Sequence, residues 1–174
     1  MTLKELAARE TRCKAEMDRI QDAVSDRAAI ENWAEAEQQE IQRSYSTLAA
    51  TESPDSLEAL KRGLFLTWFE CAEPAYLTGI RNLESAASVA IIDRLEEALT
   101  ATPADQELTE MLAYYFQVAE WCLDRYHIGG ATRAVAGRPL SLSFFTSDAE
   151  RATFHDRGLM GNYFLSLRPK TVRP

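Results

Sequence analysis

The stretch EALKRGLFLTWFECAEPAYLTGIRNL, from Glu58 to Leu83, holds the densest run of large apolar and aromatic side chains in the chain. Apolar residues recur there every three or four positions, and further aromatic residues widen the stripe almost around the helix, as expected for a helix packed on several sides. Pro74 cannot continue a helix without losing a hydrogen bond, and it pushes Glu73 toward extended geometry. The segment therefore predicts a core helix that ends between Cys71 and Pro74.

The N-terminal residues predict a long helical arm over residues 2–50. Thr2 and Glu5 have the spacing of a capping box, and neither proline nor glycine occurs before Pro54. A second apolar stripe is rotated relative to the first, which predicts a bend near Ser25 and Asp26. We expect the arm to pack one edge on the core or to pair as a coiled coil. The first stripe has a seven-residue repeat that Glu10 interrupts, and it comprises Leu3, Leu6, Cys13, Met17, Ile20 and Val24.

Two further helices complete the predicted core, which spans residues 57–128. One starts near Leu83 and is rich in alanine, which permits close approach of a neighbour. The next starts with Pro103 and Asp105, carries a clean apolar stripe, and is expected to end at Gly129 and Gly130. The stripe consists of Leu108, Met111, Leu112, Tyr115, Ala119, Cys122, Leu123 and Tyr126.

Residues 131–174 differ in composition and predict a small β-α-β appendage packed on an acidic bundle of residues 1–130. Apolar side chains alternate with serines in PLSLSFF and again in NYFLSLRP, which is the period of a strand with one buried face. Between them, Ser147 and Glu150 form a capping box that opens a short helix with Gly158 as its stop. The predicted fold is thus mainly α, an irregular helical bundle with a long N-terminal helical arm and this appendage.

The charge of −8 is unevenly distributed. Residues 1–130 carry 12 Lys and Arg against 24 Asp and Glu, whereas residues 131–174 carry 7 against 3. An acidic body repels nucleic acid and anionic membranes at long range. The basic segment is therefore expected to dock on the acidic body, or on another acidic surface.

Several chemistries find no support in the sequence. It contains no phosphate-binding loop, no nucleophile elbow and no zinc-binding H-E-x-x-H, and only two histidines. The three cysteines are isolated from each other and fall among apolar helical positions, so we expect reduced, buried thiols. No signal peptide and no membrane span is apparent, so a cytoplasmic protein without cofactor or metal is expected.

The leading hypothesis is a non-catalytic protein–protein interaction module, such as an adaptor, a regulator or an immunity-type inhibitor. Two surfaces are candidates for it. One is an acidic helical face with Glu35, Glu37 and Glu40, and the other is the pair of C-terminal strands with Tyr163, Leu165 and Leu167. The partner is another protein, or a second copy of the chain bound through the N-terminal helix.

Two alternatives remain open at this point. A carboxylate pocket of a small-ligand-binding protein or enzyme would contain Glu70, Glu73, Tyr76 and Arg81. The basic C-terminal segment, with its arginines and aromatic residues, would bind nucleic acid. A desolvated carboxylate in a concave pocket favours the first alternative, and a Glu70 side chain paired with an arginine counts against it.

Overall fold

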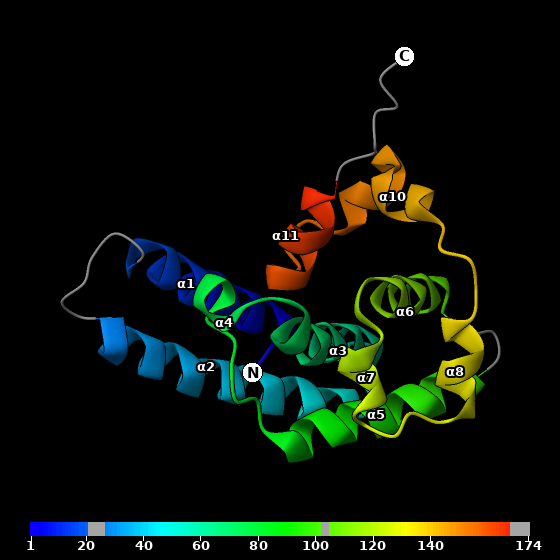
Figure 1. Ribbon diagram of the computed structural model, residues 1–174, viewed down its shortest axis with the longest axis horizontal. Coiled ribbons are helices and arrows are strands. Elements are labelled where there is room, and N and C mark those ends of the chain that lie inside the picture. The colour runs from blue at the N-terminus through cyan, green and yellow to red at the C-terminus, as the bar shows by residue number, and fades with distance from the viewer. Residues whose placement is uncertain (21–26, 102–104, 168–174) are drawn as a thin grey trace.

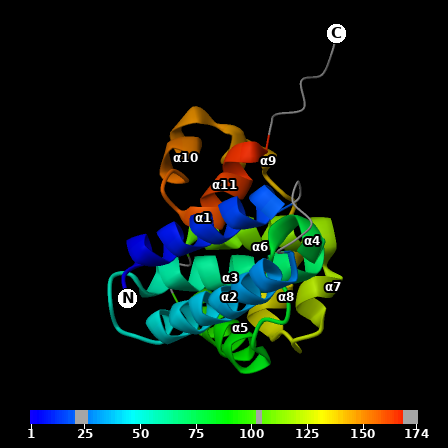
Figure 2. The ribbon, with the colours of Figure 1, turned by 90° about the vertical axis from the view of Figure 1, so that its left-hand side faces the viewer.

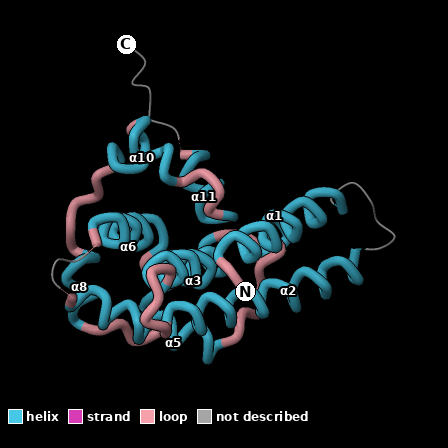
Figure 3. Tube along the Cα trace, turned by 180° about the vertical axis from the view of Figure 1, so that it is seen from behind, coloured by secondary structure: helices cyan, strands magenta, loops and turns pink. Residues whose placement is uncertain are grey.

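The computed structural model describes residues 1–20, 27–101 and 105–167, and within these ranges it contains helices and loops but no strand (Figure 3). None of the described helices has the length and apolar character needed to cross a lipid bilayer. The helices are α1 (Leu3–Ile20), α2 (Arg27–Ala49), α3 (Ser56–Ala72), α4 (Ala75–Thr78), α5 (Ser85–Thr100), α6 (Gln106–Ala119), α7 (Trp121–Asp124), α8 (Gly130–Ala136), α9 (Leu142–Thr146), α10 (Asp148–Thr153) and α11 (Gly158–Ser166).

Helix α3 is the core helix, as the sequence predicts. It lies in the middle of the molecule, with α2, α5, α6, α7 and α11 packed against it (Figures 1 and 2). Every residue from Ala59 to Trp68 is buried, including the charged Lys61 and Arg62. The helix ends at Ala72, and Glu73 has extended geometry (φ −124°, ψ 141°) directly before Pro74.

The predicted N-terminal arm is a hairpin of two helices, α1 and α2, that run side by side in opposite directions (Figure 1). Thr2 and Glu5 form the predicted capping box, with N–H to side-chain oxygen distances of 2.7 and 3.2 Å. Leu6, Cys13, Met17 and Ile20 of the seven-residue repeat are buried, because α1 packs against α2, α4 and α11. Val24 and the predicted bend at Ser25 and Asp26 lie outside the described residues.

The helix predicted up to Gly129 is shorter than expected. Pro103, the predicted first residue, lies outside the described residues; helix α6 begins at Gln106, and the Asp105 carboxylate caps it by accepting a hydrogen bond from the Leu108 amide at 2.7 Å. Helix α6 stops at Ala119, α7 adds one further turn, and His127 leaves helical geometry with φ 53°. Gly130 then begins α8 instead of ending a helix.

Replacing Asp105 by alanine is expected to lower the free energy of unfolding by about 1 kcal/mol, because the first turn of α6 loses its cap. Asp105 also contacts the Lys61 ammonium group at 2.8 Å, so the substitution has two effects. Asp105→Asn keeps a capping oxygen and removes only the charge. Urea unfolding of both variants separates the two, and equal losses for alanine and asparagine would show that the cap contributes nothing.

The predicted β-α-β appendage is wrong. Its two proposed strands are the helices α9 and α11, although the capping box between them is present, since Ser147 Oγ accepts from the Glu150 amide at 3.3 Å. In a strand, Phe145 and Phe164 would face away from their neighbours Phe144 and Tyr163, but here both are fully buried and their ring centroids stack 4.6 Å apart. Helical geometry allows these two rings to pack in the aromatic cluster that extends from α3. A pair of strands would turn both rings away from that cluster.

Buried charges attach the C-terminal helices to the bundle. The Arg157 guanidinium, before α11, is 8% exposed and bridges two carboxylates, Glu58 of α3 and Glu107 of α6. Arg157 of the basic segment thus forms ion pairs with two carboxylates of the acidic segment. Gly158 is not a helix stop but the first residue of α11, with φ 62°, and a Cβ there would lie 1.8 Å from Glu10 Oε2. Only glycine fits this contact between α11 and α1.

Candidate functional site

A disulfide between Cys71 and Cys122 joins the end of α3 to α7. The predicted reduced state is therefore wrong for these two residues, while Cys13 is free and buried as expected. The bond could not be predicted from the sequence, because the two cysteines are 51 residues apart and do not form a short motif such as C-x-x-C. Packing of α7 on α3 brings their Cα atoms to 5.4 Å, within the range that a disulfide spans.

The two elements next to the disulfide carry the two most exposed large apolar residues in the described part of the chain, Tyr76 and Trp121. Helix α4, which follows α3 directly, and helix α7, which the disulfide holds, are on the same side of the molecule (Figures 1 and 2). We name this side the α4–α7 face. Its apolar members are Tyr76 (61% exposed) and Leu77 (41%) of α4, Val118 (45%) at the end of α6, and Trp121 (62%) of α7.

Carboxylates accompany these apolar groups. Glu120 precedes Trp121, and Asp124 follows it by three residues. Within the described part of the chain, neither of these two carboxylates has an ion-pair partner. The α4–α7 face is therefore both apolar and negatively charged. This combination distinguishes it from the rest of the acidic body, where many carboxylates are neutralised by arginine or lysine.

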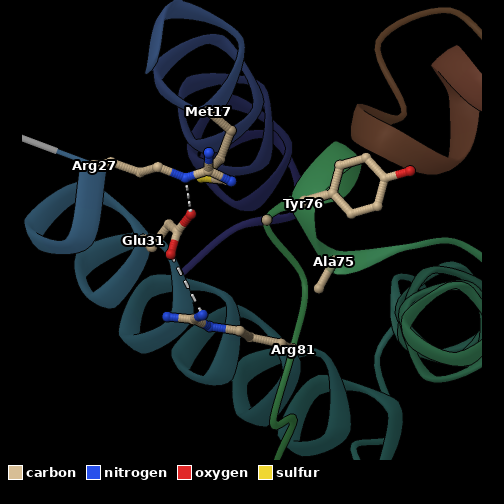
Figure 4. A pocket seen from close by; sticks show the side chains of 7 residues that line it. Met17, Arg27, Glu31, Ala75, Tyr76 and Arg81 are labelled. Carbon is tan, nitrogen blue, oxygen red and sulfur yellow. Dashed lines mark hydrogen bonds and ion pairs between the residues drawn. The ribbon is translucent and has the colours of Figure 1, made fainter. Parts of the chain in front are cut away.

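A hollow of about 300 Å³ borders the α4–α7 face where α4 meets α1 and α2 (Figure 4). Glu31 lies between two guanidinium groups, with Arg27 Nε at 2.7 Å and Arg81 Nη1 at 3.6 Å. Tyr76 and Ala75 line the side opposite these charges (Figure 4). Because each guanidinium already has a carboxylate partner, the hollow offers an apolar wall and a nearly neutral ion cluster, and not a free cationic site.

A second hollow of about 440 Å³ lies on the other side of the disulfide, between α3, α5 and the end of α7. Glu70 lines it and is only 14% exposed at its side chain. One carboxylate oxygen accepts from the Leu83 amide at 2.7 Å, and the other contacts Arg125 Nη2 at 2.9 Å. This pairing is the arrangement that counts against a catalytic role. Glu70 fixes the backbone that leads from α4 into α5.

The structure does not bring the four residues of the predicted carboxylate pocket together. Tyr76 and Arg81 line the first hollow and Glu70 lines the second. Glu73 lines neither hollow. Burial raises the pKa of Tyr114 and of Tyr163, and the negative charge of Glu73 raises both pKa values further. Of the four residues, Tyr76 belongs to the α4–α7 face.

The predicted acidic face of α2 is neutralised within the chain. Hydrogen bonds from Asn82 and Arg81 lower the pKa of Glu35, and a hydrogen bond from Arg9 lowers the pKa of Glu37. These carboxylates hold α2 against its neighbours and offer less charge to a partner than the sequence indicates. The ion pairs are Glu35 with Arg81 (2.7 Å), Glu37 with Arg9 (2.7 Å) and Glu40 with Arg43 (2.6 Å).

The residues predicted for strand-mediated binding belong to or follow α11 and contribute to internal contacts. The Tyr163 hydroxyl lies 2.8 Å from that of Tyr114, and Leu165 and Leu167 are half-buried against the core. The Arg151 guanidinium donates to the carbonyl groups of Leu165 and Leu167. Arg151 and Arg157 both belong to the segment predicted to bind nucleic acid, and both guanidinium groups form contacts within the protein.

Sequence reasoning missed Trp121, the most exposed large apolar residue in the described part of the chain. A signal for it exists, because Trp121 falls outside the apolar stripe that its neighbours Ala119, Cys122 and Leu123 continue. A large aromatic residue away from the buried stripe of an amphipathic helix indicates a surface contact.

Comparison with known proteins gives no relative for this chain: no family model, no curated protein and no solved structure matches it.

Proposed function

We propose that the protein is a protein–protein interaction module that binds its partner through the α4–α7 face. The exposure of Trp121 and Tyr76 on one side of the molecule carries this proposal. Tryptophan and tyrosine are the residues most enriched among those that dominate binding energy, and monomeric proteins expose few adjacent large apolar groups. The disulfide and the Glu70 contacts support it further, because a pre-ordered face loses little conformational entropy on binding.

Replacing Trp121 and Tyr76 by serine is expected to weaken partner binding by at least about thirtyfold, because each large aromatic anchor contributes on the order of 2 kcal/mol. Affinity capture from a lysate of the source organism identifies the partner, and titration of the purified pair measures the change. His155→Ser with Gln106→Ser is the matched control, since both side chains are exposed and outside the face. A partner that binds the variant with serine at Trp121 and Tyr76 as tightly as it binds the control and the natural chain would contradict the proposal.

A further inference from the structure

Trp121 differs from the other two tryptophans in its surroundings. Trp68 is fully buried in the aromatic cluster, and Trp33 is half-buried with the Arg12 guanidinium 5.2 Å from its ring centroid. Trp121 has neither arrangement, because no ring contact or cation of the described residues covers its indole. A large aromatic face is therefore left open to solvent beside a rigid disulfide.

The charges around this indole have one sign. Glu120 is its neighbour in the chain, and Asp124, three residues on, lies on the same side of the α7 turn. Both are exposed and free of ion-pair partners within the described ranges. The nearest cation of α7, Arg125, is occupied by Glu70 at 2.9 Å and by the Tyr126 ring at 4.7 Å from its centroid.

An aromatic ring flanked by carboxylates attracts a cation both through the quadrupole of the ring and through the neighbouring negative charges. Among aromatic side chains, tryptophan has the strongest cation–π interaction. This chain uses guanidinium groups on aromatic rings elsewhere, at Trp33, Tyr126 and Phe154. Self-association through the same face would place Glu120 and Asp124 against like charges, so a second copy fits poorly.

We infer that the α4–α7 face binds a segment of another protein in which lysine or arginine stands beside bulky apolar side chains. The cationic group lies over Trp121 between Glu120 and Asp124, and the apolar side chains contact Val118, Leu77 and Tyr76. This inference rests on the proposed function and specifies its partner. Opposite charge raises the association rate and selects against acidic partners, and the apolar contact supplies the remaining affinity.

Selection from a random dodecapeptide library displayed on phage tests the chemistry of the partner. The full-length chain is the bait, and peptides that also bind the Trp121→Ala chain are discarded. We expect the retained peptides to be rich in lysine or arginine. Their affinity, measured by fluorescence anisotropy, is expected to fall about tenfold for Glu120→Gln with Asp124→Asn. Asp93→Asn with Glu52→Gln changes the net charge equally at exposed sites elsewhere and is expected to leave the affinity unchanged.

The outcomes separate the two proposals. Retained peptides that lack cationic residues, or that bind the Glu120→Gln, Asp124→Asn chain unchanged, would overturn the cationic partner and leave the interaction face intact. If no peptide depends on Trp121, both fail. A chain that dimerises in solution and becomes monomeric on Trp121→Ala would overturn the inference in favour of self-association.

Quenching of tryptophan fluorescence gives a readout that needs no partner. In a Trp33→Phe background, Trp121 is the accessible fluorophore because Trp68 is fully buried. With each ion's quenching constant divided by that for free N-acetyltryptophanamide, the cesium ratio is expected to exceed the iodide ratio at matched ionic strength, and neutralising Glu120 and Asp124 is expected to remove the difference. A larger normalised ratio for iodide would contradict the negative potential on which the inference depends.

Discussion

Replacing both Cys71 and Cys122 by alanine is expected to lower the free energy of unfolding by about 4 kcal/mol, the largest effect of any change considered for this chain. The bond closes a loop of 51 residues, and in the chain-entropy model a loop of this size destabilises the unfolded state by about that amount. Alanine avoids placing a hydroxyl group at Cys122, which is fully buried. Urea unfolding in buffer without reductant measures the loss.

The natural chain provides its own comparison for this prediction. A thiol reductant is expected to reduce its stability to that of the double variant, and to leave the double variant unchanged. Cys13→Ala controls for the removal of a buried thiol that forms no bond. Equal stability of the natural chain and the double variant without reductant would show that the disulfide adds nothing. Loss of the bond also frees α7, so partner binding through Trp121 is expected to weaken in parallel.

The part of the fold that the sequence predicts correctly is the part decided by local physics. The apolar stripe of α3, the interruption at Pro74 and the capping box of Thr2 and Glu5 depend on residues a few positions apart, and each is found where predicted. The prediction is wrong for the C-terminal helices because the alternation of apolar and polar residues there is too short to distinguish a strand from one helical turn. The positions of Phe145 and Phe164 depend on aromatic residues that lie far away in sequence, because both rings contact Tyr114 of α6 and the Phe164 ring also contacts Phe65 of α3.

The candidate site is less predictable, because it depends on contacts between distant segments. The sequence shows that Glu35 and Glu37 are acidic, but not that Arg81 and Arg9 neutralise them. It shows Cys71 and Cys122 without their bond. A charge count therefore overestimates the free negative charge of α2, whereas Glu120 and Asp124 beside Trp121 have no ion-pair partner among the described residues.

Glu10 is the charged residue that interrupts the seven-residue apolar repeat of α1. This charged residue on the apolar stripe is 1% exposed and accepts a hydrogen bond from the Leu159 amide of α11 at 2.8 Å. Burial raises its pKa to about 7, against the opposing effect of the Leu159 hydrogen bond. Tyr45 of α2 and two charged residues of α3, Arg62 and Glu58, also act on it. The folded protein thus holds a proton that the unfolded chain releases near pH 4.5.

The sign of the resulting pH dependence follows from proton counts. Between about pH 4.5 and pH 7 the folded state binds one more proton than the unfolded state at Glu10, so its contribution to stability is full below pH 4.5 and is lost as the pH rises through 7. Over this interval the loss amounts to about 3 kcal/mol.

Glu10→Gln should remove this loss, because glutamine is neutral and its carbonyl oxygen can still accept from the Leu159 amide. We expect the variant to be more stable than the natural chain at pH 8 by up to about 3 kcal/mol, and closer to it at pH 4.5. Urea unfolding across this pH range measures both. Glu37→Gln is the control of opposite sign, since Arg9 lowers the pKa of that carboxylate and its neutralisation removes stability at pH 8. A Glu10→Gln chain whose stability changes with pH as much as that of the natural chain would show that Glu10 is not the titrating group, and that the contact between α1 and α11 tolerates a charge.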